Sequence, residues 1–263
     1  IWADDHNSPD RETALENKMS HYGSQDLYQG TIGLSWRVLF SDKTFAKTSV
    51  SYTGMMFDED WYHPITKSLN IKNRSLEESF NIRNVTQTRF SDVYYIEYGI
   101  DGKLLINSYD NYYQNTSSFG DKTGTEFTMD DKINSFKGGI FISNNLKLHR
   151  QLTGNIGIRG DYFNYNESFT VSPRLSFAFN LDDKTTLRTS YGQYHQNLPL
   201  LLLSQSEKNK ELRNPMAAHI IAGMDRLIGA DTKLTVELYQ KTYQYFPMAT
   251  EQPAVFVVDE DYF

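Results

Sequence analysis

Apolar and polar residues alternate with a period of two across residues 171–196, which indicates two β-strands joined by a tight polar turn at residues 181–185. In the first strand an apolar row that includes Val171, Leu175 and Phe179 lies opposite a row that includes Arg174 and Asn180. Successive side chains of a strand point to opposite faces of the sheet. Because the polar row could not be buried without partners, the pattern predicts a membrane β-barrel, with lipid outside and a polar lumen inside.

The same alternation recurs along the chain and predicts about ten strands. Besides the two in the 171–196 hairpin, they run roughly over residues 27–40, 44–57, 78–90, 93–106, 135–144, 151–164, 215–227 and 233–245. Such strands are longer than the ~5–6 residues usual in soluble sheets, and a tilted membrane strand needs about 9–11. No helix of consequence is expected. The predicted fold class is all-β, an antiparallel up-and-down transmembrane β-barrel segment.

The predicted connections fall into two groups. The links at residues 41–43, 91–92, 145–150, 181–185 and 229–232 are short, the link near residue 166 is intermediate, and those at 58–76, 107–134 and 197–214 are long. Short turns at one end and long loops at the other are typical of outer-membrane barrels. The polar, irregular residues 1–26 and residues 247–263 then lie at the long-loop end. Residues 1–263 are therefore interpreted as a single partial barrel domain, without a plug domain and without the remaining strands.

Composition narrows the classes of protein that fit this pattern. Aromatic residues make up 14% of the chain and include 18 tyrosines, which suits both strands and membrane interfaces. Mean hydropathy is −0.57, and no apolar run approaches the ~20 residues of a transmembrane helix. The absence of cysteine excludes a disulfide scaffold and a thiolate metal site. The net charge of −7 argues against a nucleic-acid partner.

Several strings between residues 171 and 247 match one known family in their order and spacing. They include Ser-Pro-Arg-Leu at 172–175, Lys-Thr-Thr-Leu-Arg-Thr-Ser-Tyr-Gly at 184–192, Asn-Pro at 214–215, Gly-Met-Asp at 223–225 and Leu-Thr-Val-Glu-Leu-Tyr-Gln-Lys at 234–241. In this region the chain resembles the barrel of TonB-dependent outer-membrane receptors, in the style of Bacteroidetes homologues. Elsewhere the resemblance is one of style only.

The resemblance implies a bacterial outer-membrane barrel of about 22 strands with a plugged lumen. Such receptors import a scarce ligand, such as a ferric siderophore, cobalamin or an oligosaccharide, with energy delivered by TonB. The implied partners are the lipid bilayer, the TonB complex through a plug segment, and a small-molecule or glycan ligand, with a surface lipoprotein as a further candidate. The chain has no recognisable plug or TonB-contacting segment, so it is not expected to transport on its own.

Two groups of residues are candidates for contact with a ligand or a plug. The first comprises charges predicted to face the lumen, which can bind the plug, one another or the ligand: Arg159, Arg174, Arg188, Glu237 and Lys241. The second comprises aromatic residues of the predicted long loops, which can stack on a sugar or siderophore or serve loop packing: Trp61, Tyr62, Tyr109, Tyr112 and Tyr113.

No catalytic, metal or cofactor site is predicted, and the chain is not expected to be an enzyme. The acidic runs at 58–60 and 259–261 are interpreted as solvated loop charge, with bound calcium as the alternative. The six histidines lack metal-ligand spacing, although His195 and His219 flank one predicted loop and could meet in space. The chain has no GxSxG elbow, P-loop or GxGxxG motif.

Two other classes of protein remain open at this point. A non-transporting outer-membrane barrel or adhesin would show the same strands but would lack a plug in its parent protein. A soluble β-rich carbohydrate-binding or hydrolytic domain would have to bury a second face that carries Gln29, Arg37, Lys47, Arg159 and Arg174, which is costly.

Overall fold

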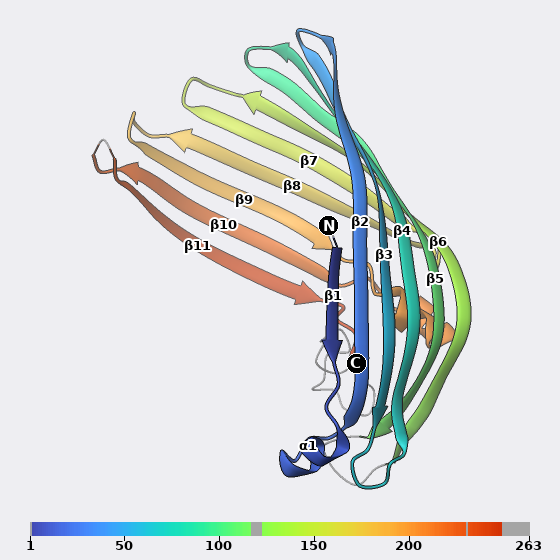
Figure 1. Cartoon of the computed structure of the whole chain (residues 1–263). Helices are drawn as coiled ribbons and strands as arrows, with labels where there is room; N and C mark the ends of the chain where they lie inside the picture. The colour runs from blue at the N-terminus through green and yellow to red at the C-terminus, as the bar shows by residue number, and fades with distance from the viewer. Residues whose placement is uncertain (1, 117–122, 230, 249–263) are drawn as a thin grey trace. The chain divides into compact units, whose positions relative to one another are not determined.

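The computed structural model describes residues 2–116, 123–229 and 231–248 and contains one antiparallel sheet of eleven strands (Figure 1). Each strand pairs with its neighbours in sequence, so the order is β1 to β11 without crossovers. The strands are β1 (Trp2–Asn7), β2 (Tyr22–Ser41), β3 (Thr44–Tyr62), β4 (Leu69–Ser91), β5 (Tyr94–Thr116), β6 (Thr123–Lys147), β7 (Leu152–Phe163), β8 (Ser168–Asn180), β9 (Thr185–His195), β10 (Met216–Leu227) and β11 (Lys233–Gln244). The predicted all-β, up-and-down fold is confirmed.

The chain divides into two compact units. The first comprises residues 1–35, 49–82 and 103–136, and the second comprises residues 36–48, 83–102 and 137–263. The long strands β2 to β6 contribute to both units, whereas β7 to β11 belong to the second. The two units are described separately below.

The register of the second unit separates the sheet into two faces. Directly paired residues share a face, so Ile156, Leu175 and Tyr191 form one cross-strand row on β7, β8 and β9. The next positions along the same strands, Gly157, Arg174 and Gly192, form a row on the opposite face. We call the first the apolar face and the second the polar face. The alternation over residues 171–196 therefore places apolar and polar side chains on opposite faces of the sheet, as predicted.

Three strands are much longer than expected: β4 and β5 have 23 residues each and β6 has 25. The predicted long loop at 58–76 is mostly strand, because β3 continues to Tyr62 and β4 starts at Leu69. The same correction applies to 107–134, where β5 continues to Thr116 and β6 starts at Thr123. Apolar alternation is lost over both segments, which is why the sequence pattern predicts loops there. A strand with polar residues on both faces can nonetheless persist, because its backbone groups remain paired.

The N-terminal region also differs from the prediction. Residues 1–26 are not wholly irregular, because β1 pairs with β2 and raises the count from ten strands to eleven. A six-residue helix, α1 (Arg11–Glu16), follows, and its N-cap Asp10 accepts a hydrogen bond from the Thr13 backbone amide at 2.7 Å. A period-2 pattern indicates strands only, so it does not reveal α1 or the other helical segments of five or six residues.

The short turns are found where they were predicted, after β2, β4, β6, β8 and β10. Of the long links, the one between β9 and β10 remains a true loop and contains α2 (Leu200–Ser204) and the 3₁₀ helix η1 (Glu207–Glu211). Leu198, Leu200, Leu202 and Leu203 of this link are buried. Among the described residues, no helix combines the length and apolar character needed to cross a membrane.

Candidate functional site

The polar face of the second unit carries an ion cluster centred on Arg159. Its guanidinium donates two hydrogen bonds to Asp101, at 2.8 and 2.9 Å, and three to Asp161, at 2.5 to 3.0 Å. Asp101 lies on β5 and Arg159 on β7, so the pair spans the intervening strand β6. All three side chains are about one quarter to one third exposed. The Arg159 guanidinium is thus engaged by two carboxylates of the sheet itself.

Gly139 of β6 leaves the space that this cluster occupies. A Cβ atom at Gly139 would lie 2.4 Å from Arg159 Nη2 and 2.7 Å from Asp161 Oδ1. Gly139 pairs directly with Asp161, so the glycine lies on the polar face beneath the ion pairs. The Gly-Gly pair at 138–139 therefore has a specific packing role at its second position.

Arg188 belongs to a second charge cluster on the same face. It donates to Asp225 at 3.0 Å, and Asp225 also accepts a hydrogen bond from Thr235 at 2.8 Å and contacts Lys233 at 3.3 Å. Arg188, Gly223 and Glu237 lie on one cross-strand row. Within the described part of the chain, Glu237 makes no ion pair within 4.0 Å.

A third group contains the other two predicted charges. Arg174, Gly192, His219 and Lys241 form one row across β8, β9, β10 and β11. The Arg174 guanidinium lies 4.8 Å from the ring centre of Tyr194, and the His219 ring lies 4.9 Å from that same ring. Neither Arg174 nor Lys241 forms an ion pair with a described carboxylate within 4.0 Å. This row is a cationic and aromatic strip on the polar face.

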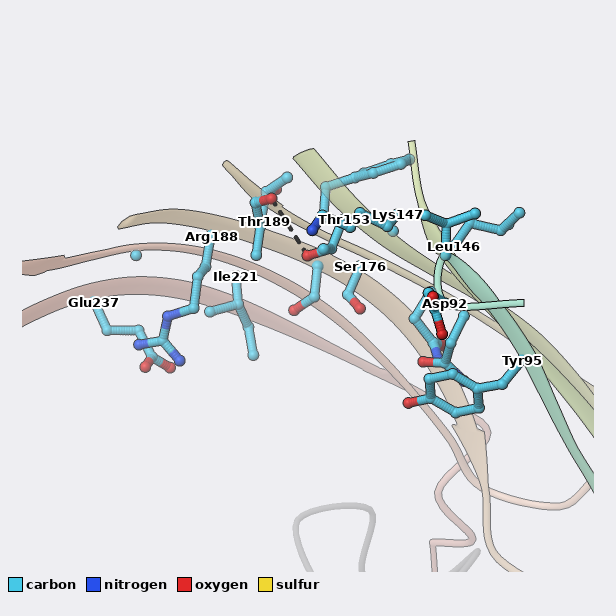
Figure 2. Close-up of a pocket in the computed structure, with 18 residues that line it drawn as sticks. Asp92, Tyr95, Leu146, Lys147, Thr153, Ser176, Arg188, Thr189, Ile221 and Glu237 are labelled. Atoms are coloured by element: carbon cyan, nitrogen blue, oxygen red, sulfur yellow. Dashed lines mark hydrogen bonds between the residues drawn. The ribbon is translucent and has the colours of Figure 1, made fainter. Parts of the chain in front are cut away.

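A cavity of about 670 Å³ opens on the second unit (Figure 2). Two cross-strand rows line it: Asn145, Asn155, Ser176 and Ser190 form one, and Lys147, Thr153, Arg188 and Glu237 contribute to the other. Figure 2 shows Arg188 and Glu237 towards one end of the cavity and Asp92 and Tyr95 towards the other. The cavity is lined by amide and hydroxyl groups and by charged groups of both signs, which suits an occupant that forms hydrogen bonds.

In the first unit, Tyr109 is the centre of a buried polar network on β4 and β5. Its hydroxyl donates to Glu77 Oε1 at 2.9 Å and accepts from Asn107 Nδ2 at 2.6 Å, and the side chain is 1% exposed. Asn111 lies two positions after Tyr109 on β5 and is fully buried, and its side-chain amide donates a hydrogen bond to Ser75 Oγ at 3.0 Å. Burial is the main cause that raises the pKa of Tyr109, and the carboxylate of Glu77 adds to it.

The five aromatic residues predicted to lie in long loops lie instead on strands. Trp61 and Tyr62 end β3, and Tyr109, Tyr112 and Tyr113 belong to β5. Trp61 is 6% exposed and contacts the His21 ring edge-on at 4.7 Å, so Trp61 and Tyr109 are not presented to solvent. Burial raises the pKa of Tyr113 to about 12. Tyr62, Tyr112 and Tyr113 are half-buried and remain candidates for ligand contact.

The acidic run at 58–60 is also on a strand rather than in a loop. Arg74 pairs with Asp58 at 3.0 Å and with Asp60 at 2.5 Å, and donates to the backbone carbonyl of Glu59 at 2.7 Å. Burial raises the pKa of Glu59, against the opposing effects of its hydrogen bonds and of Arg74. Among the described residues, no three or more His, Asp or Glu side chains are grouped so that they could hold a metal ion. The second acidic run, at 259–261, lies outside the described residues.

His195 and His219 do not meet. His195 pairs with Met216, and His219 lies three positions further along β10, so the two histidines are not neighbours in the register. His195 Nδ1 lies 3.1 Å from Ser172 Oγ. The sequence left open that the two histidines meet beside this loop, but the register of β9 and β10 sets them three positions apart.

Sequence reasoning did not single out Arg74, Glu77, Asp161, Asp225 or Asn111 as members of polar clusters. The period-2 pattern placed Asp161 on the polar face, but only the register shows which charges become neighbours. A pairing prediction built on the short turns could have brought Arg188 close to Asp225, since both lie near turns.

Comparisons with known proteins give a consistent result. A family model described as "TonB dependent receptor-like, beta-barrel" matches residues 2–210. The chain is similar to the solved structures of the ferric-catecholate import receptor Fiu from K12 E. coli (TM-score 0.63, 11% identity, 92% of this chain and 48% of that chain) and the siderophore receptor PirA from Acinetobacter baumannii (0.58, 14%, 86% and 35%). It is also similar to the copper transporter OprC (0.64, 11%, 86% and 40%).

At these identities the likeness to solved structures shows the fold alone. The chain spans 48%, 35% and 40% of the length of these three structures, in the order given above. No curated protein matches the sequence.

Proposed function

The chain belongs to the TonB-dependent receptor-like β-barrel family, and we propose that it forms part of the wall of a receptor that binds and imports a scarce ligand. The family is one of outer-membrane receptors and transporters rather than of enzymes. The apolar face of the sheet then contacts lipid, and the polar face lines the lumen. Ferric siderophores, cobalamin and oligosaccharides are the candidate ligands, and a Bacteroidetes-type affiliation stays a prediction.

The cationic and aromatic strip is the observation that supports this proposal most. Arg174, His219 and Lys241 lie on one row beside Tyr194, and no described carboxylate neutralises Arg174 or Lys241 within 4.0 Å. An arrangement that serves only the stability of the wall would pair these charges, as the wall does for Arg159. We propose that the strip contacts an anionic ligand, or anionic groups of a plug, inside the lumen.

Import also requires energy, and the proposed partners are a plug segment and the TonB complex that acts through it. A surface lipoprotein is a further proposed partner. Each of these belongs to the whole receptor rather than to the residues described above. The second candidate function, a non-transporting barrel or adhesin, differs in needing neither plug nor TonB.

Uptake by cells that express the complete receptor tests the proposal. Labelled ferric siderophore, cobalamin and oligosaccharide are supplied to cells that lack the receptor, to complemented cells, and to complemented cells without TonB. We expect one ligand to accumulate only when both receptor and TonB are present. Retained surface binding without TonB-dependent accumulation of any ligand would favour the non-transporting barrel.

The double variant Arg174→Gln, Lys241→Gln is expected to weaken binding of that ligand by at least about tenfold, because the loss of even one hydrogen bond to a charged group costs about 1.5 kcal/mol or more. Lys184→Gln, in the turn after β8, removes a positive charge away from the strip and serves as the matched control. Equal affinities for the double variant and the control would show that the strip does not bind the ligand.

A further inference from the structure

The cationic and aromatic strip and the cavity of the second unit lie next to each other on the polar face. On β8, Arg174 of the strip and Ser176 of the cavity are two positions apart and share that face, which separates them by about 7 Å. The same step on β9 leads from Gly192 to Ser190. A ligand of more than one ring is therefore long enough to contact the strip and the cavity together.

The cavity is lined by hydrogen-bonding groups that the sheet itself does not use. Within the described part of the chain, the hydroxyls of Ser176 and Ser190 form no hydrogen bond, and Glu237 forms no ion pair. Asn145 Oδ1 accepts a hydrogen bond from Asn155 Nδ2 at 2.6 Å, but the Asn145 amide donates to no described residue. These donors and acceptors are therefore available to an occupant.

Gly223 leaves room between the two charged residues at one end of the cavity (Figure 2). A Cβ atom at Gly223 would lie 3.8 Å from Arg188 Nη2 and 3.9 Å from Glu237 Cγ, which are ordinary contact distances. Arg188 is paired with Asp225 at 3.0 Å, so the charge of Glu237 dominates at this end. Because a carboxylate only accepts hydrogen bonds, this end favours a ligand group that donates them and disfavours a second anion.

The strip adds an aromatic ring that lies along the wall. A Cβ atom at Gly192 would lie 2.8 Å from the Tyr194 hydroxyl oxygen and 2.9 Å from its Cε2, so the ring folds back over this glycine. Tyr194 remains 40% exposed and lies between Arg174 and His219. A ring in this position offers one face to the C–H groups of a sugar, while Arg174 beside it offers charged hydrogen bonds to an anion.

We propose that the ligand is an oligosaccharide with a carboxylate on its terminal sugar. The acidic sugar stacks on Tyr194 with its carboxylate towards Arg174 and Lys241, and the neutral sugars extend into the cavity towards Glu237. Sugar hydroxyls both donate and accept hydrogen bonds, so they match the free serine, amide and carboxylate groups. The cavity of about 670 Å³ falls within the ~300–1,000 Å³ of small-molecule sites. This inference rests on the proposed function and names the class of its ligand.

Isothermal titration calorimetry on the purified complete receptor in dodecyl maltoside micelles tests the proposal. The acidic probes are sialyllactose, glucuronosyl-lactose and galacturonosyl-lactose, and galactosyl-lactose is the neutral trisaccharide. We expect at least one acidic probe to bind at least about tenfold more tightly than the neutral one, because its carboxylate gains charged hydrogen bonds at the strip. Binding of none of the three acidic probes, as when a plug fills the cavity, would overturn the proposal. Equal affinities for acidic and neutral probes would do the same.

The variant Glu237→Gln tests the orientation of the ligand by the sign of its effect. We expect the bound acidic probe to lose about tenfold in affinity, since a sugar hydroxyl then loses its charged acceptor. An anion seated in the cavity would instead bind more tightly once the charge of Glu237 is removed. Unchanged or tighter binding would therefore overturn the proposal. Glu237 is exposed and forms no ion pair within the described residues, so this variant preserves the wall.

The variant Gly223→Leu fills the room at the same end and is expected to abolish binding of the acidic probe. Ala222→Leu is the matched control, because Ala222 lies on the adjacent position of β10 and faces the apolar side of the sheet. We expect the control to keep the affinity of the unmodified receptor. Equal affinities for the two variants would place the ligand outside the cavity.

The uptake assay described above separates failure of this inference from failure of the proposed function. TonB-dependent accumulation of ferric siderophore or cobalamin by a receptor that binds no acidic probe would overturn this inference alone. Binding of an acidic probe without TonB-dependent accumulation of that probe or of any other ligand would overturn the proposed import and leave the binding site standing.

Discussion

Replacing Gly139 by valine is expected to lower the free energy of unfolding by about 2–3 kcal/mol, since breaking a buried ion pair costs about 3–5 kcal/mol and exposed pairs contribute little. The new Cβ would lie 2.4 Å from Arg159 Nη2, so the guanidinium must leave Asp101 and Asp161. Two carboxylates would then face each other without their shared cation. Guanidinium-induced unfolding in micelles, followed by tryptophan fluorescence, measures the change.

The neighbouring variant Gly138→Val is the matched control. Gly138 pairs with Tyr162 and therefore points to the opposite face from Gly139. Both variants add the same side chain to the same strand, so their difference isolates the ion cluster. Equal unfolding midpoints for the two variants would show that the space over Gly139 is not needed for the Arg159 cluster.

Replacing Tyr109 by alanine has the second large expected effect, a loss of about 3–5 kcal/mol in the stability of the first unit, because a large buried side chain leaves a cavity. Tyr109 is 1% exposed and bonds both Asn107 and Glu77. Tyr109→Phe removes only the hydroxyl and is expected to cost about 1–2 kcal/mol, the value of a hydrogen bond whose partners stay buried.

Hydrogen–deuterium exchange of peptides from β4 and β5 measures this effect locally. We expect faster exchange in β4 around residues 75–79 and in β5 around residues 107–111 in Tyr109→Ala, with unchanged exchange in β8 and β9. Tyr98→Ala, at a 40% exposed position of the same strand, is the control and should change little. Similar exchange in Tyr109→Ala and Tyr98→Ala would contradict a stabilising network around Tyr109.

The parts of the fold that the sequence predicted well are those with strong alternation and tight turns. Residues 171–196 are β8 and β9, with the turn where it was expected, because apolar Leu175 and polar Arg174 require opposite environments. The prediction was wrong where polar residues occupy both faces. Asn70, Asn107 and Asn111 give no apolar periodicity, but their side chains are buried on regular strands.

The sequence predicted on which face of the sheet the candidate residues lie, but not which residues they contact. Arg159, Arg174 and Arg188 are all on the polar face, as alternation alone indicated. Whether each is neutralised depends on the register of the paired strands, and for Arg159 the partner Asp101 lies on a strand that is not adjacent in sequence. No periodic pattern carries that information. The aromatic residues were misplaced for a different reason, since their position depended on loops that are in fact strands.

The assignment of the two faces is the central claim, and site-directed labelling along β8 tests it most directly. The chain has no cysteine, so a cysteine introduced at each position from 174 to 180 is a unique attachment point within it. A fluorophore on each cysteine is examined in bilayers with lipid-bound nitroxide quenchers. We predict strong quenching at Leu175, Phe177 and Phe179 and weak quenching at Arg174, Ser176, Ala178 and Asn180. Equal quenching at both sets, or the reverse order, would contradict the account.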